Sequence, residues 1–218
     1  MDSKIYSYKN KDVEVTWDKK RCIHAKECVH GLPNVFDISK NPWIDPDNTT
    51  NLKDLKKVIE ACPTGALHYN FTNNENSESP DNTNTLLIAT DGPLYARGDI
   101  HIVDMEDHLI MQDTRVAFCR CGASSNKPFC DNSHIEENFK AGTAFNPERL
   151  ELEPSSETGG KLTAKLVPNG PVVVEGNYTL NGGDKKTKTK KKMSFCRCGA
   201  SSNKPFCDGS HRDIDFKA

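Results

Sequence analysis

Long hydrophobic runs are absent from this sequence of 218 residues, in which no unbroken apolar stretch exceeds the four residues at 86–89. A membrane-spanning helix needs about 20 consecutive apolar residues, so none is expected. The same lack, together with a polar N-terminus of mixed charge, argues against a secretory signal and an arginine-rich transit peptide. We therefore expect a cytoplasmic protein with no membrane partner.

Apolar side chains are scarce overall, at 35% of the residues, and only 7% of the residues are aromatic. A chain this polar cannot build one deep core, so small domains stabilised by metal sites or disulfides are expected. An excess of one charge is also missing, since 29 basic and 31 acidic residues give a net charge of -2. This balance argues against nucleic acid as a partner.

Cysteine, in contrast, is plentiful, and its count of nine is odd. In a reducing compartment, cysteines bind metal or react more often than they form disulfides. One residue separates Cys119 from Cys121, and one separates Cys196 from Cys198. Neighbours this close do not easily bridge to each other, but their thiolates can converge on one metal centre.

An internal repeat organises the second part of the chain. Residues 118–131 recur without change at 195–208, with looser similarity at 139–141 and 216–218. A Gly-Pro turn precedes a β-leaning stretch in each copy, at 94–103 and at 172–180. Each copy therefore predicts a hairpin or meander followed by a cysteine loop, and the two copies are expected to pack about a pseudo-twofold axis.

Each repeat carries three cysteines and one histidine with the spacing C-x-C-x8-C-x3-H. Three thiolates and an imidazole can complete a tetrahedral site, so zinc and iron–sulfur centres both fit this ligand chemistry. Asp131 and Asp208 are good helix N-caps, which predicts that the following histidine lies in the first turn of a helix. Arg120 and Arg197 are expected either to donate to metal-bound sulfurs or to lie at the surface.

The pattern C-x-C-x2-S-x3-P-x-C-D-x-S-H, met twice, resembles the CDGSH iron–sulfur family, the mitoNEET-like proteins. This resemblance covers about residues 85–218 and implies one [2Fe-2S] cluster per motif. In such a cluster, the closely spaced cysteine pair holds an inner iron, and a cysteine with a histidine holds an outer iron. By position, the implied ligands are Cys119, Cys121, Cys130 and His134 for the first cluster, and Cys196, Cys198, Cys207 and His211 for the second.

Two further expectations follow from the same resemblance. Asn132 replaces the family glycine that Gly209 retains, and asparagine is the least costly replacement where a positive φ is needed. Single-motif members of the family form dimers, so two motifs in one chain imply a monomer that contains an internal pseudo-dimer.

The first 71 residues hold a different cysteine set, Cys22, Cys28 and Cys62, in the pattern C-x5-C…C-P. This segment resembles the divergent single-cluster ferredoxins, with Ala25 at the position of the middle cysteine. Three thiolates favour a [3Fe-4S] cluster, and a [4Fe-4S] cluster follows if water or His24 supplies the fourth ligand. A domain whose cysteines are empty or hold zinc is the alternative.

Local patterns in the same segment predict its elements. Short strands are expected at 14–17 and 67–71, and a helix at 51–61 places Cys62 on its buried face. Trp17 and Trp43 are expected in the core.

The sequence thus predicts an α+β protein with a small ferredoxin-like domain at 1–71, a polar linker at 72–84 and a mostly β tandem CDGSH domain at 85–218. Within the tandem domain, the repeats span about 85–141 and 160–218 and are expected to be related by internal pseudo-twofold symmetry.

The predicted function is one-electron transfer with an unidentified redox partner protein, by two [2Fe-2S] clusters and a third cluster of [3Fe-4S] or [4Fe-4S] type. An imidazole in place of one thiolate is expected to raise the reduction potential above that of an all-cysteine cluster. The alternatives are transfer of intact clusters to an apo-acceptor, redox or pH sensing, and a zinc-stabilised interaction module. No enzymatic activity is expected, because no substrate-binding motif remains once the cysteines are assigned.

Overall fold

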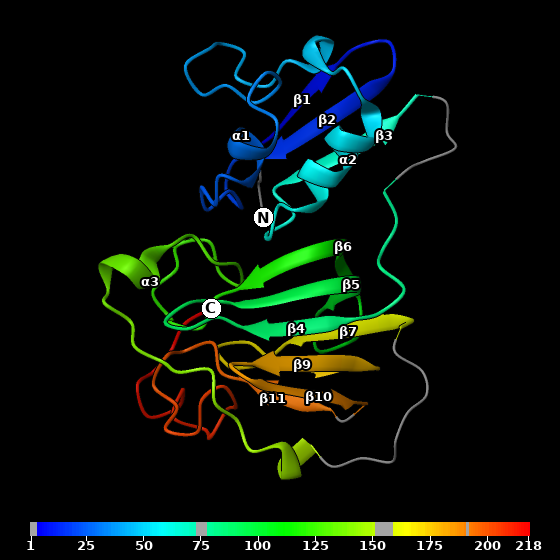
Figure 1. Cartoon of the computed structure of the whole chain (residues 1–218). Helices are drawn as coiled ribbons and strands as arrows, with labels where there is room; N and C mark the ends of the chain where they lie inside the picture. Colours follow the sequence, from blue (N-terminus) through cyan, green and yellow to red (C-terminus); the bar gives the residue numbers. More distant parts are fainter. Residues whose placement is uncertain (1–3, 73–77, 151–158, 191) are drawn as a thin grey trace. The chain divides into compact units, whose positions relative to one another are not determined.

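The computed structural model describes residues 4–72, 78–150, 159–190 and 192–218, which form two compact units at Met1–Ser79 and Pro80–Ala218 (Figure 1). Most of the regular secondary structure is β-strand and the helices are short, which confirms the predicted fold class. Residues 73–77 of the predicted linker lie outside the described part. Within the described part, no helix has the length and apolar character that crossing a membrane requires.

The N-terminal unit is a three-stranded antiparallel sheet, in the order β1-β2-β3, with two helices packed on it. Its elements are β1 (Ile5–Lys9), β2 (Val13–Asp18), α1 (Glu27–Gly31), the 3-10 turn η1 (Pro46–Asn48), α2 (Leu52–Glu60) and β3 (Leu67–Phe71). The strands and the helix predicted for this unit are therefore confirmed.

Helix α2 is fixed at both ends by local interactions. The Asn51 side chain accepts a hydrogen bond of 2.9 Å from the Lys53 amide and caps the N-terminus. Leu55 and Ile59, one turn apart, are fully buried against the sheet. Just beyond the helix, the Cys62 amide donates to the Ile59 carbonyl at 3.0 Å, so burial of this apolar face also positions Cys62.

The C-terminal unit contains one eight-stranded mixed sheet in the order β10-β9-β4-β5-β7-β8-β11, with β6 paired to β5. Its strands are β4 (Thr85–Ile88), β5 (Leu94–Val103), β6 (Leu109–Phe118), β7 (Lys161–Leu166), β8 (Val172–Glu175), β9 (Tyr178–Gly182), β10 (Lys185–Thr189) and β11 (Met193–Phe195). Two short helical turns, α3 (Ser133–Glu136) and η2 (Pro147–Leu150), lie in its loops.

One predicted strand of this unit divides into two. The first repeat forms β5 at 94–103 as predicted, but the equivalent stretch of the second repeat forms β8 and β9. Gly176 lies between them with φ +129. A positive φ of this kind is open mainly to glycine. Gly98, at the equivalent place in β5, has φ +135, and there the strand continues past a shift in its register with β6.

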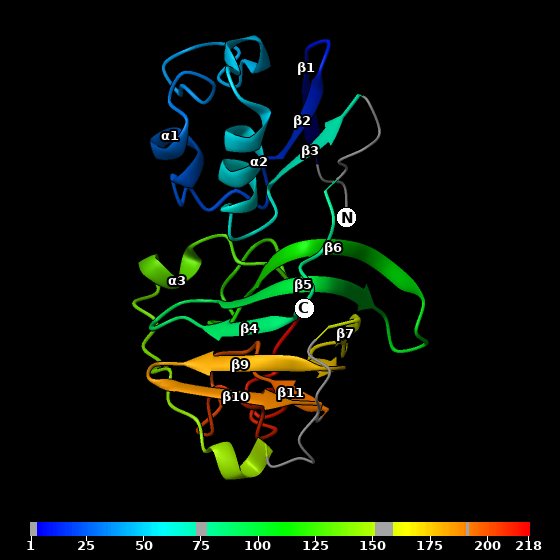
Figure 2. The same cartoon turned by 45° about the vertical axis from the view of Figure 1, so that its right-hand side comes forward.

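The two repeats interlock through reciprocal strand pairing. Within each repeat the pairing is antiparallel, as in β4 with β5 and β7 with β8. Between repeats it is parallel, because β4 lies beside β9 and β7 lies beside β5. Figures 1 and 2 both show β4 between β5 and β9. A single apolar core draws residues from both repeats, so neither repeat buries its apolar face alone.

The cysteine loops of the two repeats meet back to back in an isolated antiparallel bridge between Cys121 and Cys198. Each is followed by a glycine in the left-handed region, Gly122 at φ +83 and Gly199 at φ +80. A Cβ atom on either glycine would clash with the backbone carbonyl of the other repeat's cysteine. The close approach of the two loops therefore requires glycine on both sides.

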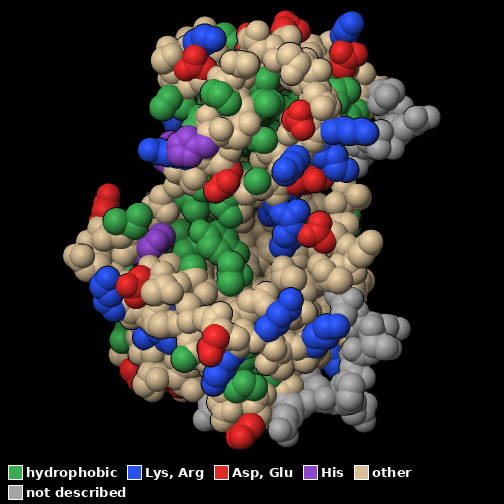
Figure 3. All heavy atoms as spheres, in the orientation of Figure 1, with side chains coloured by type: hydrophobic (Ala, Val, Ile, Leu, Met, Phe, Trp, Pro, Cys, Tyr) green, Lys and Arg blue, Asp and Glu red, His purple; other side chains and the backbone are tan. Residues whose placement is uncertain are grey.

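Charged side chains of both signs share the surface. On the face shown in Figure 3, Lys and Arg side chains are interspersed with Asp and Glu side chains. This mixing matches the nearly balanced charge of the sequence.

Substitution of the crossing glycines is expected to destabilise the C-terminal unit. Gly199→Ala combines a left-handed φ with a backbone clash and should lower the free energy of unfolding by about 2 kcal/mol or more. Gly142→Ala is the control, because its Cβ meets nothing within 4 Å, and it should change stability by less than about 0.5 kcal/mol. Urea unfolding followed by circular dichroism makes the comparison, and equal midpoints would contradict the close crossing.

Candidate metal centres

The closely spaced cysteines of each repeat form a pair. In the first repeat the Sγ atoms of Cys119 and Cys121 lie 3.6 Å apart, and in the second those of Cys196 and Cys198 also lie 3.6 Å apart. Cys119 follows β6 directly, and its amide donates to the Pro128 carbonyl at 2.9 Å, which closes the loop. The Cys119 and Cys121 thiols interact strongly, which lowers the pKa of Cys119 and raises that of Cys121.

The remaining predicted ligands form a second pair in each repeat. Nδ1 of His134 lies 3.5 Å from Sγ of Cys130, and Nδ1 of His211 lies 3.4 Å from Sγ of Cys207. The other ring nitrogen, Nε2, faces the Gly-Pro turn ahead of each motif, at Gly92 in the first repeat. Nδ1 is thus the ring nitrogen that faces the cysteine sulfur, a distinction that the sequence spacing does not make.

Asp131 and Asp208 are not helix N-caps, so this part of the prediction is wrong, although His134 does lie in the first turn of α3 as predicted. Helix α3 begins after Asn132, which has no side-chain cap interaction, and the second repeat forms only turns at the equivalent place. The Asp208 carboxylate instead accepts hydrogen bonds from the amide and hydroxyl of Ser210 and of Ser202. These bonds hold the pKa of Asp208 well below its usual range. Each aspartate therefore joins the loop of the inner pair to the loop of the outer pair.

The position after each aspartate does need a positive φ, as expected. Asn132 adopts φ +74 and Gly209 adopts φ +98. The first motif thus tolerates asparagine where the family glycine is replaced.

Arg120 and Arg197 do not lie at the surface, because they are only 3% and 4% exposed, and they donate to backbone carbonyls. Arg120 donates to Ala89 at 2.8 Å, and Arg197 donates to Gly170 at 2.8 Å. These bonds tie each cysteine loop to the Gly-Pro turn of its own repeat. Burial lowers the pKa of both guanidinium groups, while Cys196 acts oppositely on Arg120 and Cys119 on Arg197. A buried cation that interacts with a cysteine of the other repeat fits an anionic group at each centre.

The separation of the pairs distinguishes a binuclear centre from a single ion. A tetrahedral zinc with Zn–S bonds of about 2.3 Å holds all its ligand atoms about 3.8 Å apart. Among the described residues, which include all nine cysteines, the ligand atoms of three side chains lie within 4.8 Å of one another only at Asp104, Glu106 and His108. The cysteine and histidine ligands therefore form close pairs that are held apart. This arrangement fits two irons per motif and does not fit one zinc ion.

The acidic group at 104–108 was not singled out from the sequence. It lies in the turn between β5 and β6, where Asp104 accepts from the amides of Glu106 and His108 at 2.9 Å. These local hydrogen bonds account for the close approach of its side chains.

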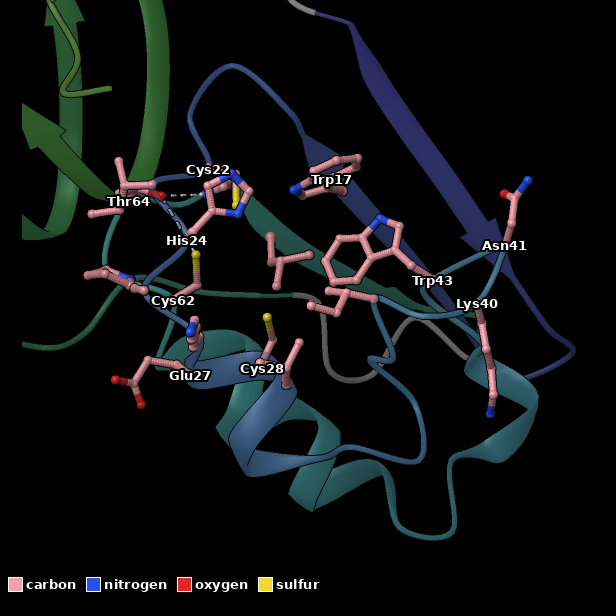
Figure 4. A pocket seen from close by; sticks show the side chains of 18 residues that line it. Trp17, Cys22, His24, Glu27, Cys28, Lys40, Asn41, Trp43, Cys62 and Thr64 are labelled. Carbon is pink, nitrogen blue, oxygen red and sulfur yellow. Dashed lines mark hydrogen bonds between the residues drawn. The ribbon is translucent and has the colours of Figure 1, made fainter. Parts of the chain in front are cut away.

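The N-terminal cysteines line a cavity of about 380 Å³ (Figure 4). Cys22 follows β2, Cys28 lies in α1 and Cys62 follows α2, so three separate elements place the thiols around one space. Burial raises the pKa of Cys28 to about 11, so a metal must displace its proton. The three thiols form no single-ion group within 4.8 Å, which fits a polynuclear cluster better than zinc.

The loop between Cys22 and Cys28 is conformationally strained. His24 and Lys26 adopt φ +55 and +65, on either side of Ala25 at the missing cysteine's position. Left-handed non-glycine residues cost about 1–3 kcal/mol each and cluster at functional sites. All three residues line the cavity, and Figure 4 shows the His24 ring on the side of the cavity that holds Cys22 and Cys62.

Trp17 and Trp43, both predicted in the core, lie between the core and the cavity. Both pack against the core of the N-terminal unit but are only partly buried, and both line the cavity. Their ring centroids lie 4.9 Å apart in an edge-to-face arrangement.

Gly209 of the second motif, which has a positive φ, is expected to tolerate replacement by asparagine better than replacement by alanine. Gly209 has φ +98 and open space around it, so backbone strain alone decides the outcome. Gly209→Ala should cost about 1 kcal/mol more than Gly209→Asn, which reproduces the residue of the first motif. Thermal unfolding of both variants measures this difference, and equal stabilities would show that the position does not require the left-handed region.

Comparison with known proteins assigns both units. Residues 8–71 match the family described as "Divergent 4Fe-4S mono-cluster", and residues 91–135 and 169–212 match "Iron-binding zinc finger CDGSH type". The chain is 33% identical to "Uncharacterized protein YjdI" of Escherichia coli (strain K12) over 69 residues, which are 32% of this chain and 90% of the relative.

A second set of relatives matches the other unit. The chain is 31% identical to "CDGSH iron-sulfur domain-containing protein 1" of Rattus norvegicus over 108 residues, which are 48% of this chain and 91% of the relative. The protein of the same name from Mus musculus is 29% identical over 108 residues. No solved structure matches the chain significantly. The chain therefore belongs to the CDGSH iron–sulfur family and joins two of its motifs to a domain of the divergent 4Fe-4S mono-cluster family.

Proposed function

We propose that the protein is a one-electron carrier that holds a [2Fe-2S] cluster in each CDGSH motif and a [4Fe-4S] cluster in its N-terminal unit. The observation that carries the proposal is the pairing of ligand atoms, at 3.4–3.6 Å, in both motifs. Two close pairs held apart are what a [2Fe-2S] cluster requires, and such clusters supply one-electron chemistry.

The residues around each pair of ligand atoms favour reduction of the proposed [2Fe-2S] cluster. Nδ1 of His134 and of His211 stands where an all-cysteine site has a thiolate, which removes one negative charge and raises the reduction potential. The buried Arg120 and Arg197 act in the same direction, since a nearby cation stabilises the more negative, reduced state. The chain thus stabilises the added electron with its own charges.

No reaction on a small molecule is assigned to the chain. In this proposal all nine cysteines serve as ligands, so none remains as a nucleophile. Electrons then pass to or from a separate redox partner protein.

His24 is the fourth ligand that we propose for the N-terminal cluster. It lines the same cavity as Cys22, Cys28 and Cys62, and its strained φ of +55 is explained if the ring is needed there. The family description, which names a 4Fe-4S cluster, supports four ligands rather than three.

Metal analysis after anaerobic purification tests the cluster content. We expect about eight irons and about eight sulfides per chain, about four irons after Cys62→Ser, and about seven after His24→Ala. His30→Ala, which changes a histidine outside the cavity lining, should leave the iron content unchanged. Zinc without sulfide would contradict the electron-carrier function, whereas four irons in the unmodified chain would contradict only the N-terminal cluster.

Electron exchange between the units is the second test. After rapid partial reduction, the absorbance of the N-terminal and CDGSH clusters should equilibrate in a phase whose rate is independent of protein concentration. The Cys62→Ser chain should lack that phase, because it has no N-terminal cluster to exchange with. Absence of the phase from the unmodified chain would contradict intramolecular transfer, and movement of intact clusters to an apo-ferredoxin would favour the cluster-transfer alternative.

A further inference from the structure

Trp17 holds a defined place between the two cysteine-bearing loops of the N-terminal unit. It lies on β2, and the period of two places it on the same face as the fully buried Val13 and Val15. In β3 it pairs with Leu67, which lies five positions after Cys62. Trp17 therefore stands where the loop that leads to Cys22 and the loop that follows Cys62 come together.

Its neighbours hold the indole ring in one orientation. The Tyr6 ring lies 5.5 Å away on one strand, and the Trp43 ring meets it edge to face at 4.9 Å. Close to it, the Asp18 amide donates to the Ala66 carbonyl at 2.8 Å, which ties the two loops together. The ring therefore cannot turn its polar edge to a different side without disturbing these contacts.

That polar edge has an unused donor. Nε1 of Trp17 is sealed from solvent and makes no hydrogen bond, although a buried indole N–H usually finds a partner. An unsatisfied buried donor is unfavourable, so an acceptor is expected. Trp17 lines the cysteine cavity, and in Figure 4 the nitrogen corner of its ring faces the side that holds Cys22 and His24.

The chemistry of the cavity indicates which acceptor that is. Its lining is mostly apolar, and on the side that Nε1 faces it offers sulfur as a soft acceptor from Cys22. Metal binding turns such thiols into thiolates and adds sulfide, both of which accept N–H hydrogen bonds more strongly than a neutral thiol. The unused donor is therefore satisfied when the cluster is bound.

We infer that the indole N–H of Trp17 donates a hydrogen bond to a sulfur of the N-terminal cluster and thereby raises its reduction potential. This inference rests on the proposed [4Fe-4S] cluster of that unit. The physical reason is that the added electron increases the negative charge on the sulfurs, so the hydrogen bond is stronger in the reduced state. Trp17 is thus a residue that adjusts the potential of the site without binding iron.

The two tryptophans of the chain make a matched comparison, because both line the cavity and both have a buried indole N–H without a hydrogen bond, but only the nitrogen of Trp17 faces Cys22 and His24; that of Trp43 faces away from the cysteines (Figure 4). In the full chain, Trp17→Phe should lower the equilibrium constant for reduction of the N-terminal cluster about tenfold, equivalent to about 59 mV for a one-electron couple. Trp43→Phe should change it less than threefold. EPR-monitored redox titration measures both, using the signal that is lost in Cys62→Ser.

A second measurement does not depend on the folding of the Trp17 variant. In the Trp43→Phe chain, the remaining tryptophan is Trp17, so a label on the indole nitrogen reports on it alone. Electron–nuclear double resonance of the reduced cluster should detect this nitrogen and an exchangeable proton that disappears in heavy water.

Different results would contradict the role of Trp17 and the presence of the N-terminal cluster. Equal potentials in Trp17→Phe and the unmodified chain with full iron content, or no coupling to the labelled indole, would overturn the role of Trp17. Absence of iron and sulfide from the N-terminal unit of the unmodified chain would overturn the proposed cluster instead.

Discussion

The contact on which the C-terminal unit depends is the backbone crossing of Cys121 and Cys198. It brings the inner cysteine loops of the two repeats closer together than any Cβ at Gly122 or Gly199 would permit. The reciprocal pairing of β4 with β9 and of β5 with β7 holds this crossing from the sheet side. Two ligand loops that could be independent are thus fixed to each other by backbone alone.

This arrangement explains how a chain with few apolar side chains keeps its ligands in place. The outer ligands are held by hydrogen bonds rather than by a deep core: Asp131 and Asp208 each join two loop segments through serine donors. Arg120 and Arg197 add bonds from the inner loops to the preceding turns. Polar networks of this kind are stable only when every member is satisfied, which is the case for these four side chains.

Much of this could be predicted from the sequence, because repeated spacing and period-two patterns report directly on backbone geometry. The helix with Leu55 and Ile59 on one face and the strand at 94–103 follow from such patterns. The ligand pairs were also foreseen, since one intervening residue brings two sulfurs together. The division of the predicted strand at Gly176 was not, because a lone glycine also fits inside a strand, as Gly98 does in β5.

The remaining differences between the sequence predictions and the structure concern hydrogen-bond partners, because sequence patterns do not show which partner a polar side chain takes. Asp131 has the residue type of a helix N-cap, but it lies one position before Asn132, and its hydrogen bonds go both to Ser125 and to Ser133, the first residue of α3. Arg120 has the charge typical of a surface residue but is buried. It donates to the Ala89 carbonyl and interacts with Cys196 of the other repeat. The role of Trp17 was hidden for a similar reason: an aromatic residue at a core position gives no sign that its N–H lacks a partner.

Identical loops do not make the two CDGSH sites equivalent, because the strands that support them differ. The Cys130 amide donates to Ala117, whose neighbour in β5 is Tyr95. The Cys207 amide donates to Ser194, whose neighbour in β8 is Val173. The backbone support is the same at 2.8 Å, but the supporting residue pairs with a tyrosine in one repeat and with a valine in the other. The ligand geometry is therefore the same in the two repeats, whereas the supporting strand positions carry side chains of different polarity.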